Sequence, residues 1–409
     1  MMRVVFVNRF YAPDISATSQ LLTDLAVAMA AGGAEVHVVA SRLRYDEPAA
    51  VLRAAERIDD AAVRRVRTTS FGRGNLVGRA FDYLSFYVSA TFCLLGLLRK
   101  GDVVVAKTDP PLISVPAWCV AKLRGARTVN WLQDVFPEAA GALGLSVGRG
   151  ISGRVLAWLR NVSLRGARVN VVLGRLMRDR VAGLGVDPAN IVVIPNWADG
   201  SAVRPVPVES NPLRAEWRLG GKFVVGYSGN MGRVHEFQTL LEAASVLKGD
   251  TDVAFLFIGE GAQKAALARE IETRGLGNVE FKPYQPRERL GESLSAADVH
   301  IVSLLPALEG LVVPSKFYGI AAAGRPAIFV GDPDGELASV LRDAECGLCL
   351  RPGDSDGLVA AIQTLRQDQA LRERMGRNAR RIFEERFDKK LAIEKWRGLL
   401  TEVAEGRRG

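Results

Sequence analysis

The chain alternates strand signals with helix signals, and it does so twice. In the first half, short apolar runs typical of buried strands occupy residues 4–8, 35–40, 102–108, 128–133 and 169–174. The pattern restarts in the second half at residues 223–229, 254–259, 279–284, 299–305, 327–331 and 347–350. Helical stretches separate the runs, and such alternation is typical of parallel strands joined by helical crossovers. We therefore predict an α/β protein with two doubly wound, Rossmann-like domains that face a central cleft.

A linker separates the two halves. Residues 196–213 are rich in Pro, Ser and Asn and lack periodicity, which is typical of a connecting segment. We place the boundary near residue 205, which divides the 409 residues into a domain of residues 1–204 and a domain of residues 205–388. Residues 389–409 carry apolar side chains at helical spacing, and we predict a helix that crosses back to the N-terminal domain.

The net charge of +9 favours anionic partners. Lys and Arg are spread along the chain without the aromatic-interleaved basic motif of a nucleic-acid protein, so we expect no nucleic-acid partner and favour anionic lipid. The first residues form a strand and a turn rather than a signal peptide, which predicts a cytoplasmic protein. The apolar context of Cys346 and Cys349 predicts two buried strand residues rather than a metal or redox pair.

Residues 83–98 form an uncharged, largely apolar run. Arg73 and Arg79 precede this run, and Arg99 and Lys100 follow it. About sixteen residues is short for a membrane span, which needs about twenty. A buried core helix, an interfacial helix on a membrane surface and a true span all remain open. The interfacial alternative predicts peripheral attachment to the inner face of the plasma membrane.

Loops that follow strands are the expected binding sites, because ligands of open parallel sheets bind at the carboxyl ends of the strands. Residues 8–14 follow the first strand and lack G-x-G-x-x-G, so a nicotinamide or flavin dinucleotide loses its main support. The loop after residues 223–229 contains Gly229, Asn230, Gly232 and Arg233. Its glycines let backbone approach a phosphate, and the Arg233 guanidinium offers several donors, although an ordinary strand-to-helix turn would look the same.

A second loop begins at Glu309 and leads into a helix predicted from near Pro314 to Gly324. This helix is short and contains Gly319, which costs about 1 kcal/mol relative to Ala, so packing alone explains it poorly. Backbone N–H groups before a helix and the positive end of its dipole hold phosphate. The residues that we expect to bind the phosphate here are Gly310, Leu311, Val312, Ser315 and Lys316. Two such loops in one domain point to a diphosphate.

The chain resembles GT-B glycosyltransferases of retaining family 4, particularly bacterial surface-polysaccharide members similar to colanic acid and O-antigen transferases. The motifs that carry the resemblance are FYAPDISATSQLLTDLA, KTDPPL, WLQDVFPEA, IPNWAD, GYSGNMGRVHEFQTLLEA, FIGEG, NVEF and EGLVVPSKFYGIAAAGRP. The resemblance implies transfer of a sugar from a nucleotide diphosphate donor, bound mainly by the C-terminal domain, to an acceptor bound mainly by the N-terminal domain. Members with this pattern often use polyprenyl-diphosphate-linked saccharide acceptors at the inner membrane face.

The resemblance also implies roles for single residues. In a front-face substitution the leaving diphosphate accepts the acceptor's proton, and Lys316 and Arg233 would stabilise the growing charge. Glu309 would orient sugar hydroxyls, or alternatively act as a helix-dipole partner. Asp134, in WLQDVFPEA, would bind or polarise the acceptor hydroxyl, or alternatively cap a loop.

The chain departs from the wider family pattern at three positions. Asn230 and His235 stand where the family has an Arg and a Lys, and the family's second glutamate, a ribose ligand, falls on Gly319. Glu336 is our candidate for the missing glutamate.

We expect no metal or other cofactor. Residues 332–334 form a D-x-D, but the Pro within it and the Gly after it favour a turn. Two alternatives to a transferase remain: a nucleotide-sugar epimerase of the same fold, and a non-catalytic, membrane-peripheral partner of a polysaccharide assembly.

Overall fold

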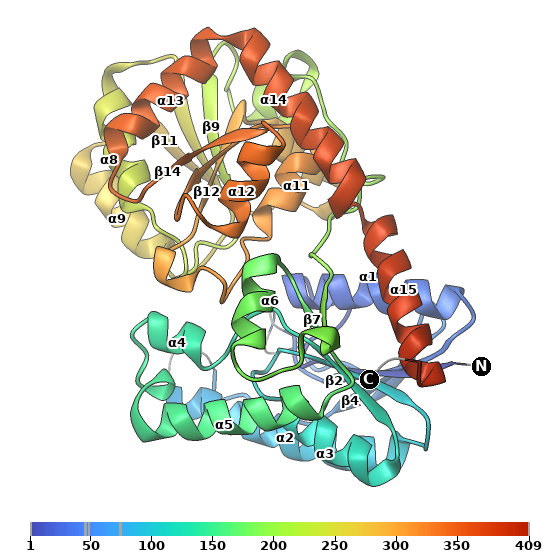
Figure 1. The fold of residues 1–409 in the computed structure, drawn as a ribbon. Coiled ribbons are helices and arrows are strands. Elements are labelled where there is room, and N and C mark those ends of the chain that lie inside the picture. The colour runs from blue at the N-terminus through green and yellow to red at the C-terminus, as the bar shows by residue number, and fades with distance from the viewer. Residues whose placement is uncertain (1, 45–46, 48–49, 73–75, 408–409) are drawn as a thin grey trace. The chain divides into compact units, whose positions relative to one another are not determined.

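The computed structural model describes residues 2–44, 47, 50–72 and 76–407, and the chain divides into two compact units. Unit 1 comprises residues 1–195 together with 392–409, and unit 2 comprises residues 196–391. Each unit has a sheet of its own with helices packed against it (Figure 1). The α/β prediction with two Rossmann-like domains is therefore confirmed.

Unit 1 is built on an eight-stranded sheet with the order β3-β4-β2-β1-β5-β6-β7-β8. Its strands are β1 (Arg3–Val7), β2 (Glu35–Ser41), β3 (Ala55–Ile58), β4 (Ala61–Val66), β5 (Val103–Lys107), β6 (Arg127–Trp131), β7 (Val169–Val172) and β8 (Ile191–Val193). Its helices are α1 (Ala17–Ala31), α2 (Leu76–Leu97), α3 (Ser114–Arg124), α4 (Glu138–Ala142), α5 (Gly150–Gly166), α6 (Arg175–Ala182) and most of α15 (Lys389–Glu405). The strands pair in parallel, apart from the antiparallel hairpin of β3 and β4.

Helices cover both faces of this sheet, which explains why its central strands are apolar throughout. On one face, Phe86 of α2 and Ala117 of α3 pack in a cluster with Val104 of β5. On the other face, Trp396 of α15 packs against Trp131 of β6, with ring centroids 4.7 Å apart and ring planes tilted by 55°. The last helix of the chain thus completes the core of the first unit.

Unit 2 has a six-stranded parallel sheet with the order β11-β10-β9-β12-β13-β14. Its strands are β9 (Phe223–Ser228), β10 (Val253–Ile258), β11 (Val279–Lys282), β12 (Val299–Ser303), β13 (Ala327–Val330) and β14 (Gly347–Leu350). Its helices are α7 (Pro212–Glu216), α8 (Gln238–Val246), α9 (Lys264–Arg274), α10 (Leu290–Ser295), α11 (Lys316–Ala322), α12 (Glu336–Asp343), α13 (Ser355–Gln367) and α14 (Gln369–Ile382).

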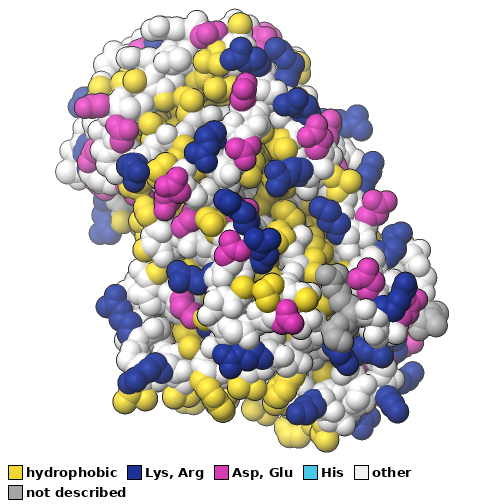
Figure 2. Space-filling view, in the orientation of Figure 1, with side chains coloured by type: hydrophobic (Ala, Val, Ile, Leu, Met, Phe, Trp, Pro, Cys, Tyr) yellow, Lys and Arg dark blue, Asp and Glu magenta, His cyan; other side chains and the backbone are white. Residues whose placement is uncertain are grey.

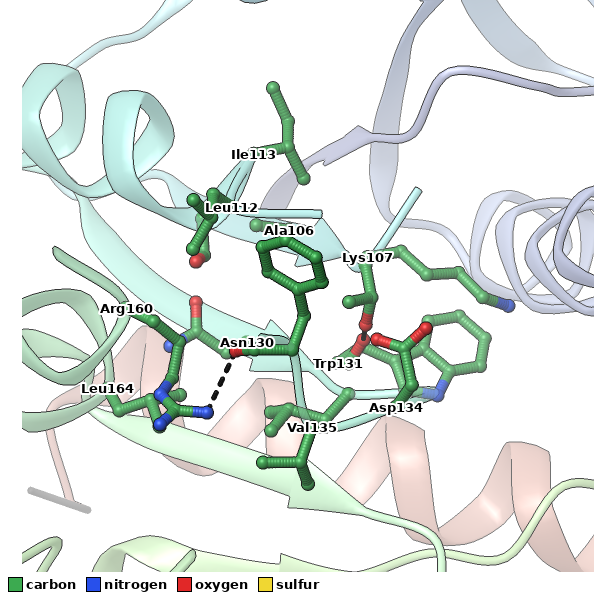
Figure 3. A pocket seen from close by; sticks show the side chains of 14 residues that line it. Ala106, Lys107, Leu112, Ile113, Asn130, Trp131, Asp134, Val135, Arg160 and Leu164 are labelled. Carbon is green, nitrogen blue, oxygen red and sulfur yellow. Dashed lines mark hydrogen bonds between the residues drawn. The ribbon is translucent and has the colours of Figure 1, made fainter. Parts of the chain in front are cut away.

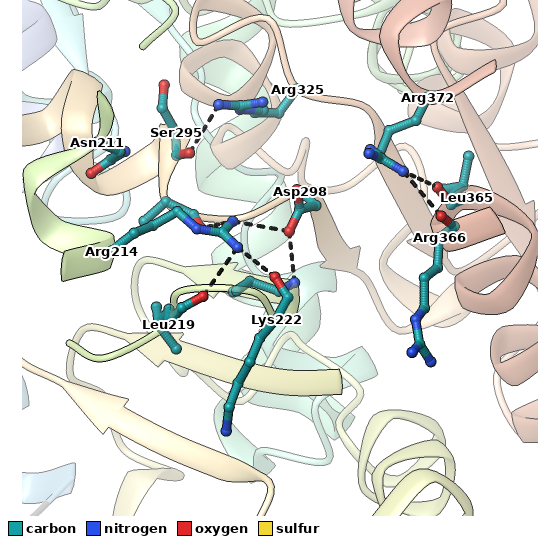
Figure 4. A network of polar contacts seen from close by, with 12 residues as sticks. Asn211, Arg214, Leu219, Lys222, Ser295, Asp298, Arg325, Leu365, Arg366 and Arg372 are labelled. Atoms are coloured by element: carbon teal, nitrogen blue, oxygen red, sulfur yellow. Dashed lines mark hydrogen bonds and ion pairs between the residues drawn. The ribbon is translucent and has the colours of Figure 1, made fainter. Parts of the chain in front are cut away.

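A buried ion pair holds the amino ends of the two central strands of unit 2 together. The Asp298 carboxylate, just before β12, accepts hydrogen bonds from the Arg214 guanidinium at 3.0 Å and from the Val224 N–H of β9 at 2.7 Å (Figure 4). Arg214 also donates to the carbonyls of Leu219 and Lys222. This network fixes β12 beside β9, and the candidate site forms at the opposite ends of the same two strands.

The boundary between the units lies earlier than the predicted position near residue 205. The division falls between residues 195 and 196, because the following residues bind the end of unit 2. The Ala198 N–H donates to the Phe387 carbonyl at 3.2 Å, and the Lys389 N–H donates to the Ala198 carbonyl at 2.9 Å. Unit 2 also extends to residue 391, so the first residues of α15 belong to it.

Three strands of unit 1 are not predicted by the apolar runs. β3 and β4 form an edge hairpin with several exposed residues, so they lack the signal of a strand buried on both faces. β8 has only three residues, which is too short for a pattern to show.

Candidate active site

The two predicted phosphate loops meet at the centre of the unit 2 sheet. β9 pairs with β10 on one side and with β12 on the other, so the loops after β9 and β12 leave the sheet on either side of a topological switch point. The Leu305 N–H donates to the Val234 carbonyl at 3.0 Å, which joins the two loops directly. The structure therefore brings together Gly229–Arg233 and the segment from Glu309 to Lys316.

Lys316 connects these loops through its side chain. Its ammonium donates to the Asn230 carbonyl at 3.0 Å and to His235 Nε2 at 2.5 Å, and it lies 4.9 Å from the centroid of the Tyr227 ring. Among the described residues, no carboxylate forms an ion pair with it. Burial lowers the pKa of Lys316 to about 7. The site thus holds one amine among neutral groups.

Gly229 makes room for this amine. Its φ of +122° is a conformation that L side chains rarely adopt, and a Cβ there would lie 2.8 Å from Lys316 Cε. The loop is fixed from the other side by the end of β10 and the loop after it, because the Gly229 N–H donates to the Ile258 carbonyl at 2.8 Å and the Met231 N–H donates to the Glu260 carbonyl at 2.7 Å. Arg233 extends from the same loop with an exposed side chain.

Sequence reasoning gave His235 no role, although the structure places it beside Lys316. The His235 ring is 8% exposed, and its Nδ1 contacts the Ser303 carbonyl at 2.6 Å. Burial and, after it, the Lys316 charge lower the pKa of His235 to about 3, so the imidazole is neutral. The position of His235 in the glycine-containing loop, where the family pattern has a Lys, could have indicated a role at the site from the sequence.

Glu309 binds the N-terminus of a helix. Its Oε1 accepts a hydrogen bond at 2.9 Å from the N–H of Glu336, the first residue of α12. A Cβ on Gly335 would lie 2.6 Å from Glu309 Oε2, so the glycine lets the carboxylate approach. These contacts correspond to the alternative role of helix-dipole partner, and they bring Glu336 next to Glu309. Burial raises the pKa of Glu309, and Asp332 and Glu336 add to the rise.

The predicted backbone phosphate donors are engaged in this structure. Helix α11 begins at Lys316 rather than near Pro314, so Ser315 precedes it. The N–H groups of Leu311 and Val312 donate to the Leu308 carbonyl at 2.9 and 3.1 Å. Gly310 has a φ of +71° and its N–H turns toward the carboxylate of Glu309. The N–H groups of residues 310–312 are therefore engaged, whereas the side-chain cations of the two loops are available to an anion.

Gly319 lies within α11, and its missing side chain faces protein. A Cβ at this position would lie 3.2 Å from a methyl group of Leu294, which is buried on α10. The nearest neighbour of position 319 is therefore a flexible side chain of the packed interior.

Unit 1 has a switch point of its own, between β1 and β5. A small pocket near it is lined by residues of β5, β6, the loops that follow them and α5, and Asp134 and Arg160 lie on opposite sides of it (Figure 3). Its volume of about 30 Å³ holds a water molecule rather than a sugar. Arg160 is occupied, because it donates to both carboxylate oxygens of Glu138 at 2.9 and 2.7 Å.

Asp134 stands at this pocket with a carboxylate oxygen that has no partner. Its Oδ1 is buried and accepts no hydrogen bond from the described residues, in contrast to a loop cap. Burial, with a contribution from Asp109, raises the pKa of Asp134 to about 7. An acceptor hydroxyl is the kind of group that such an oxygen can bind.

Two neighbours of Asp134 were missed, although both lie in the motif KTDPPL. Burial raises the pKa of Asp109 to about 6, and Lys107 is fully buried with its ammonium 3.5 Å from the centroid of the Trp131 ring. Burial also lowers the pKa of Lys107. Both residues lie at the carboxyl end of β5, next to the switch point. That position could have identified them as candidate site residues from the sequence.

Residues 332–334 form the expected turn. The Gly335 N–H donates to the Asp332 carbonyl, and the Asp334 N–H donates to the Asp332 side chain, both at 3.0 Å. Across the described ranges, no three His, Cys, Asp or Glu side chains gather into a group able to hold an ion. The prediction of two buried strand residues is only partly right: Cys346 is buried but lies just before β14, whereas Cys349 is in β14 but only half-buried, and both are free thiols.

Comparison with known proteins identifies both units. Residues 17–197 match the glycosyl transferase 4-like domain, and residues 210–382 match glycosyl transferases group 1. A relative in Escherichia coli (strain K12), named as the colanic acid biosynthesis glycosyl transferase WcaI, is 29% identical over 376 residues, which cover 88% of this chain and 91% of that protein. The glycosyltransferase WbjE of Pseudomonas aeruginosa is 29% identical over 314 residues, covering 74% of this chain and 76% of that protein.

Solved structures share the fold. Sucrose-phosphate synthase from Thermosynechococcus elongatus superimposes with a TM-score of 0.81 at 16% identity, covering 99% of this chain and 100% of that chain. HepE of Anabaena, solved in complex with UDP-glucose, gives a TM-score of 0.73 at 16% identity, covering 98% of this chain and 100% of that chain. Neither family model describes an epimerase or a non-catalytic protein. The resemblance read from the motifs is confirmed, and the chain belongs to the glycosyltransferases of the GT-B fold, with a glycosyl transferase 4-like first unit and a group 1 second unit.

Proposed function

We propose that the protein transfers a sugar, with retention of its anomeric configuration, from a nucleotide diphosphate donor to a polyprenyl-diphosphate-linked saccharide during the synthesis of a surface polysaccharide. The names of two Escherichia coli relatives, which refer to colanic acid and to the O-antigen chain, support the product class. The nucleotide bound in HepE supports the donor class.

The observation that carries the donor assignment is the Lys316 amine without a counter-ion. An ammonium has three N–H donors, and here two of them meet neutral acceptors, the Asn230 carbonyl and the His235 ring. A half-buried cation without a carboxylate partner gains from a ligand that brings negative charge. A diphosphate supplies that charge, and the exposed Arg233 on the same loop adds further donors.

The reaction that we propose needs no protein nucleophile and no metal. The bond between the anomeric carbon and the diphosphate oxygen breaks while the acceptor hydroxyl oxygen bonds to the same face of that carbon. The hydroxyl proton passes to the leaving diphosphate oxygen. Negative charge grows on the leaving group, and Lys316 and Arg233 stabilise it there. Asp134 of unit 1 binds the acceptor hydroxyl.

A Glu309→Gln variant tests the transfer step. The amide oxygen can still accept the Glu336 N–H, so the N-terminus of α12 stays bound while the charge is lost. We propose that this carboxylate, besides binding the N-terminus of α12, orients the sugar in the transition state, so we expect kcat to fall by about tenfold or more with donor affinity little changed. The assay screens UDP- and GDP-sugars with a bacterial lipid extract and determines the anomeric configuration of the product by NMR.

The matched control is Glu288→Gln, which removes an exposed carboxylate of the same unit and should leave kcat unchanged. Unchanged turnover in Glu309→Gln would remove Glu309 from the mechanism. A product of inverted configuration would refute the retaining reaction.

Helix α2 combines two of the alternatives considered for residues 83–98. Its buried side, which includes Phe86 and Leu94, packs in the core of unit 1, and its other side exposes Val77, Phe81, Leu84, Val88 and Phe92. Val77–Leu97 is long and apolar enough to span a membrane. However, the buried Asp82 carboxylate accepts hydrogen bonds from Thr69 and Phe71. These contacts favour a helix that lies on a membrane surface while it stays in the fold.

Neighbouring helices extend this exposed surface, which we call the apolar face. Its further members are Leu123 at the end of α3 and Ile151, Val155 and Trp158 on α5. Hydrophobic side chains gather along the lower edge of Figure 2, where α2, α3 and α5 run in Figure 1.

The charges around the apolar face favour anionic lipid. The sequences of α2, α3 and α5 contain one acid, the buried Asp82, whereas Lys122, Arg124, Arg154 and Arg165 are exposed. Arg73, one of the predicted flanking cations, lies outside the described residues. Exposed apolar side chains and exposed cations on the same helices bind an anionic bilayer through both burial and charge, so we propose peripheral attachment to the inner face of the plasma membrane.

A Phe92→Glu variant tests this attachment. Phe92 is 71% exposed, so the substitution should leave unit 1 folded while it places a charge in the apolar face. We expect co-sedimentation with vesicles of anionic phospholipid to fall by about tenfold or more, because burying an unpaired carboxylate costs more than the benzyl group gains. The control is Val246→Glu on α8, which is 62% exposed in unit 2 and should bind vesicles as the parent does. If the parent protein stays in solution even at low salt, the attachment is refuted.

A further inference from the structure

We propose that His235 is a positioning residue that holds the Lys316 amine for the donor's diphosphate, and that this amine takes up a proton when the diphosphate binds. The inference rests on the donor proposed above and adds a residue and a protonation step to it.

The hydrogen bonds of His235 fix which nitrogen carries its proton. A backbone carbonyl only accepts hydrogen bonds, so Nδ1, which lies 2.6 Å from the Ser303 carbonyl, must be the protonated nitrogen. In a neutral ring the other nitrogen is then an acceptor, and Nε2 lies 2.5 Å from the Lys316 ammonium. Ser303 ends β12, so the sheet itself sets the orientation of the ring.

The other groups that contact the Lys316 amine are neutral. The Asn230 carbonyl accepts from Lys316 and also from the Tyr227 hydroxyl, both at 3.0 Å, so its two lone pairs are in use. The Tyr227 ring lies 4.9 Å from the ammonium. One N–H of Lys316 is left without an acceptor among the described residues, and a phosphate oxygen can take it.

The titratable groups on the surrounding elements are neutral or act on other residues, so they do not compensate the charge of the Lys316 amine. Burial raises the pKa of Tyr227 on β9, so its hydroxyl stays neutral. Glu260, after β10, pairs with Lys264 at 2.6 Å. On the loops after β12 and β13, the charges of Asp332 and Glu336 act on Glu309. Burial is the cause of the lowered pKa of Lys316.

A bound diphosphate supplies the negative charge that the Lys316 amine lacks in the free protein. Lys316 has a pKa of about 7 in the free protein, and an adjacent dianion returns it toward the ordinary value of about 10.4. At a pH between these two pKa values, the amine of the free protein is mostly neutral and that of the complex is mostly charged. Diphosphate binding then takes up a proton. Diphosphate affinity is therefore highest below pH 7 and falls by up to about tenfold per pH unit above it.

Isothermal titration calorimetry at pH 8, in two buffers with different enthalpies of ionisation, counts the protons taken up. The probes are UDP, GDP and inorganic diphosphate, which share the diphosphate and differ in the base. We expect the parent protein to take up nearly one proton and Lys316→Arg close to none, because a guanidinium is charged throughout this range. The difference between the two proteins cancels any titration of the probe itself.

Two variants test the role of His235. His235→Leu removes the acceptor at Nε2 and should weaken diphosphate binding by about tenfold, the usual cost of losing a hydrogen bond to a charged group. In His235→Gln the side-chain oxygen can take the place of Nε2, so we expect affinity within about threefold of the parent and the same pH profile. If His235→Leu does not fold, His235→Gln and Lys316→Arg still decide the matter.

Diphosphate binding without proton uptake, or with equal uptake in Lys316→Arg, would overturn the inference and leave the proposed donor standing. Failure of all three probes to bind would overturn both. A loss in His235→Gln as large as that in His235→Leu would show that His235 acts through packing alone.

Discussion

Replacing Lys316 with methionine is expected to lower kcat/KM by about two to three orders of magnitude. Methionine keeps an unbranched, apolar stem beside Gly229 but removes the ammonium from the Asn230 carbonyl and His235 Nε2. The leaving diphosphate then loses a charge-assisted hydrogen bond at the point where its negative charge grows. Steady-state kinetics with the donor found in the screen measures the loss. Equilibrium binding should show a larger loss for a nucleoside diphosphate than for the nucleoside.

Lys264→Met is the matched control for this prediction. Lys264 begins α9 next to the same loops, but its ammonium pairs with Glu260 at 2.6 Å and is not held for a ligand. We expect kcat/KM within about twofold of the parent, since surface ion pairs contribute little. Equal losses for nucleoside and nucleoside diphosphate in Lys316→Met, or an equal kinetic loss in Lys264→Met, would contradict the assignment of Lys316 to the diphosphate.

Replacing Trp396 with alanine should lower the free energy of unfolding of unit 1 by about 3–5 kcal/mol. Trp396 has no exposed surface, and its ring packs against Trp131, which carries the buried Lys107 ammonium on its ring face. The substitution removes the aromatic partner of Trp131 and opens a cavity next to an amine that burial already disfavours. Chemical denaturation followed by circular dichroism measures the change, and limited proteolysis shows which unit opens first.

Trp158→Ala is the control, because it removes the same side chain from the same unit where the residue is 64% exposed on α5. A surface substitution of this kind changes stability by about 0.5 kcal/mol or less. If the two variants unfold at the same denaturant concentration, the packing of Trp396 against β6 does not stabilise unit 1.

The fold was predictable from the strands that are buried on both faces. β5 and β10 have every residue buried, and such strands appear in a sequence as unbroken apolar runs. β3 and β4 could not be found in this way, because an edge hairpin mixes exposed and buried residues. The position of the boundary depends on the contact of Ala198 with Phe387, which no local pattern encodes.

The candidate site was predictable as a set of loops but not as a set of contacts. Glycines and cations after β9 and β12 indicated which segments would converge, and they do. The partner of Glu309 is a backbone N–H at position 336, and the partner of His235 is the carbonyl of Ser303. Backbone donors and acceptors have no signature in the residue type, so these roles need the tertiary structure.

The discontinuous composition of unit 1 has a consequence for the order of events on the ribosome. Residues 392–409 belong to this unit, yet they are synthesised only after the whole of unit 2. At about 5–20 residues per second, roughly 10–40 s separate the synthesis of residue 195 from that of Trp396. During that interval Trp131 lacks its aromatic partner, whereas residues 196–391 can complete a sheet as soon as they emerge. The unit that is translated first is therefore the last to be finished, and a nascent chain released before its final helix lacks the part of the core that Trp396 supplies.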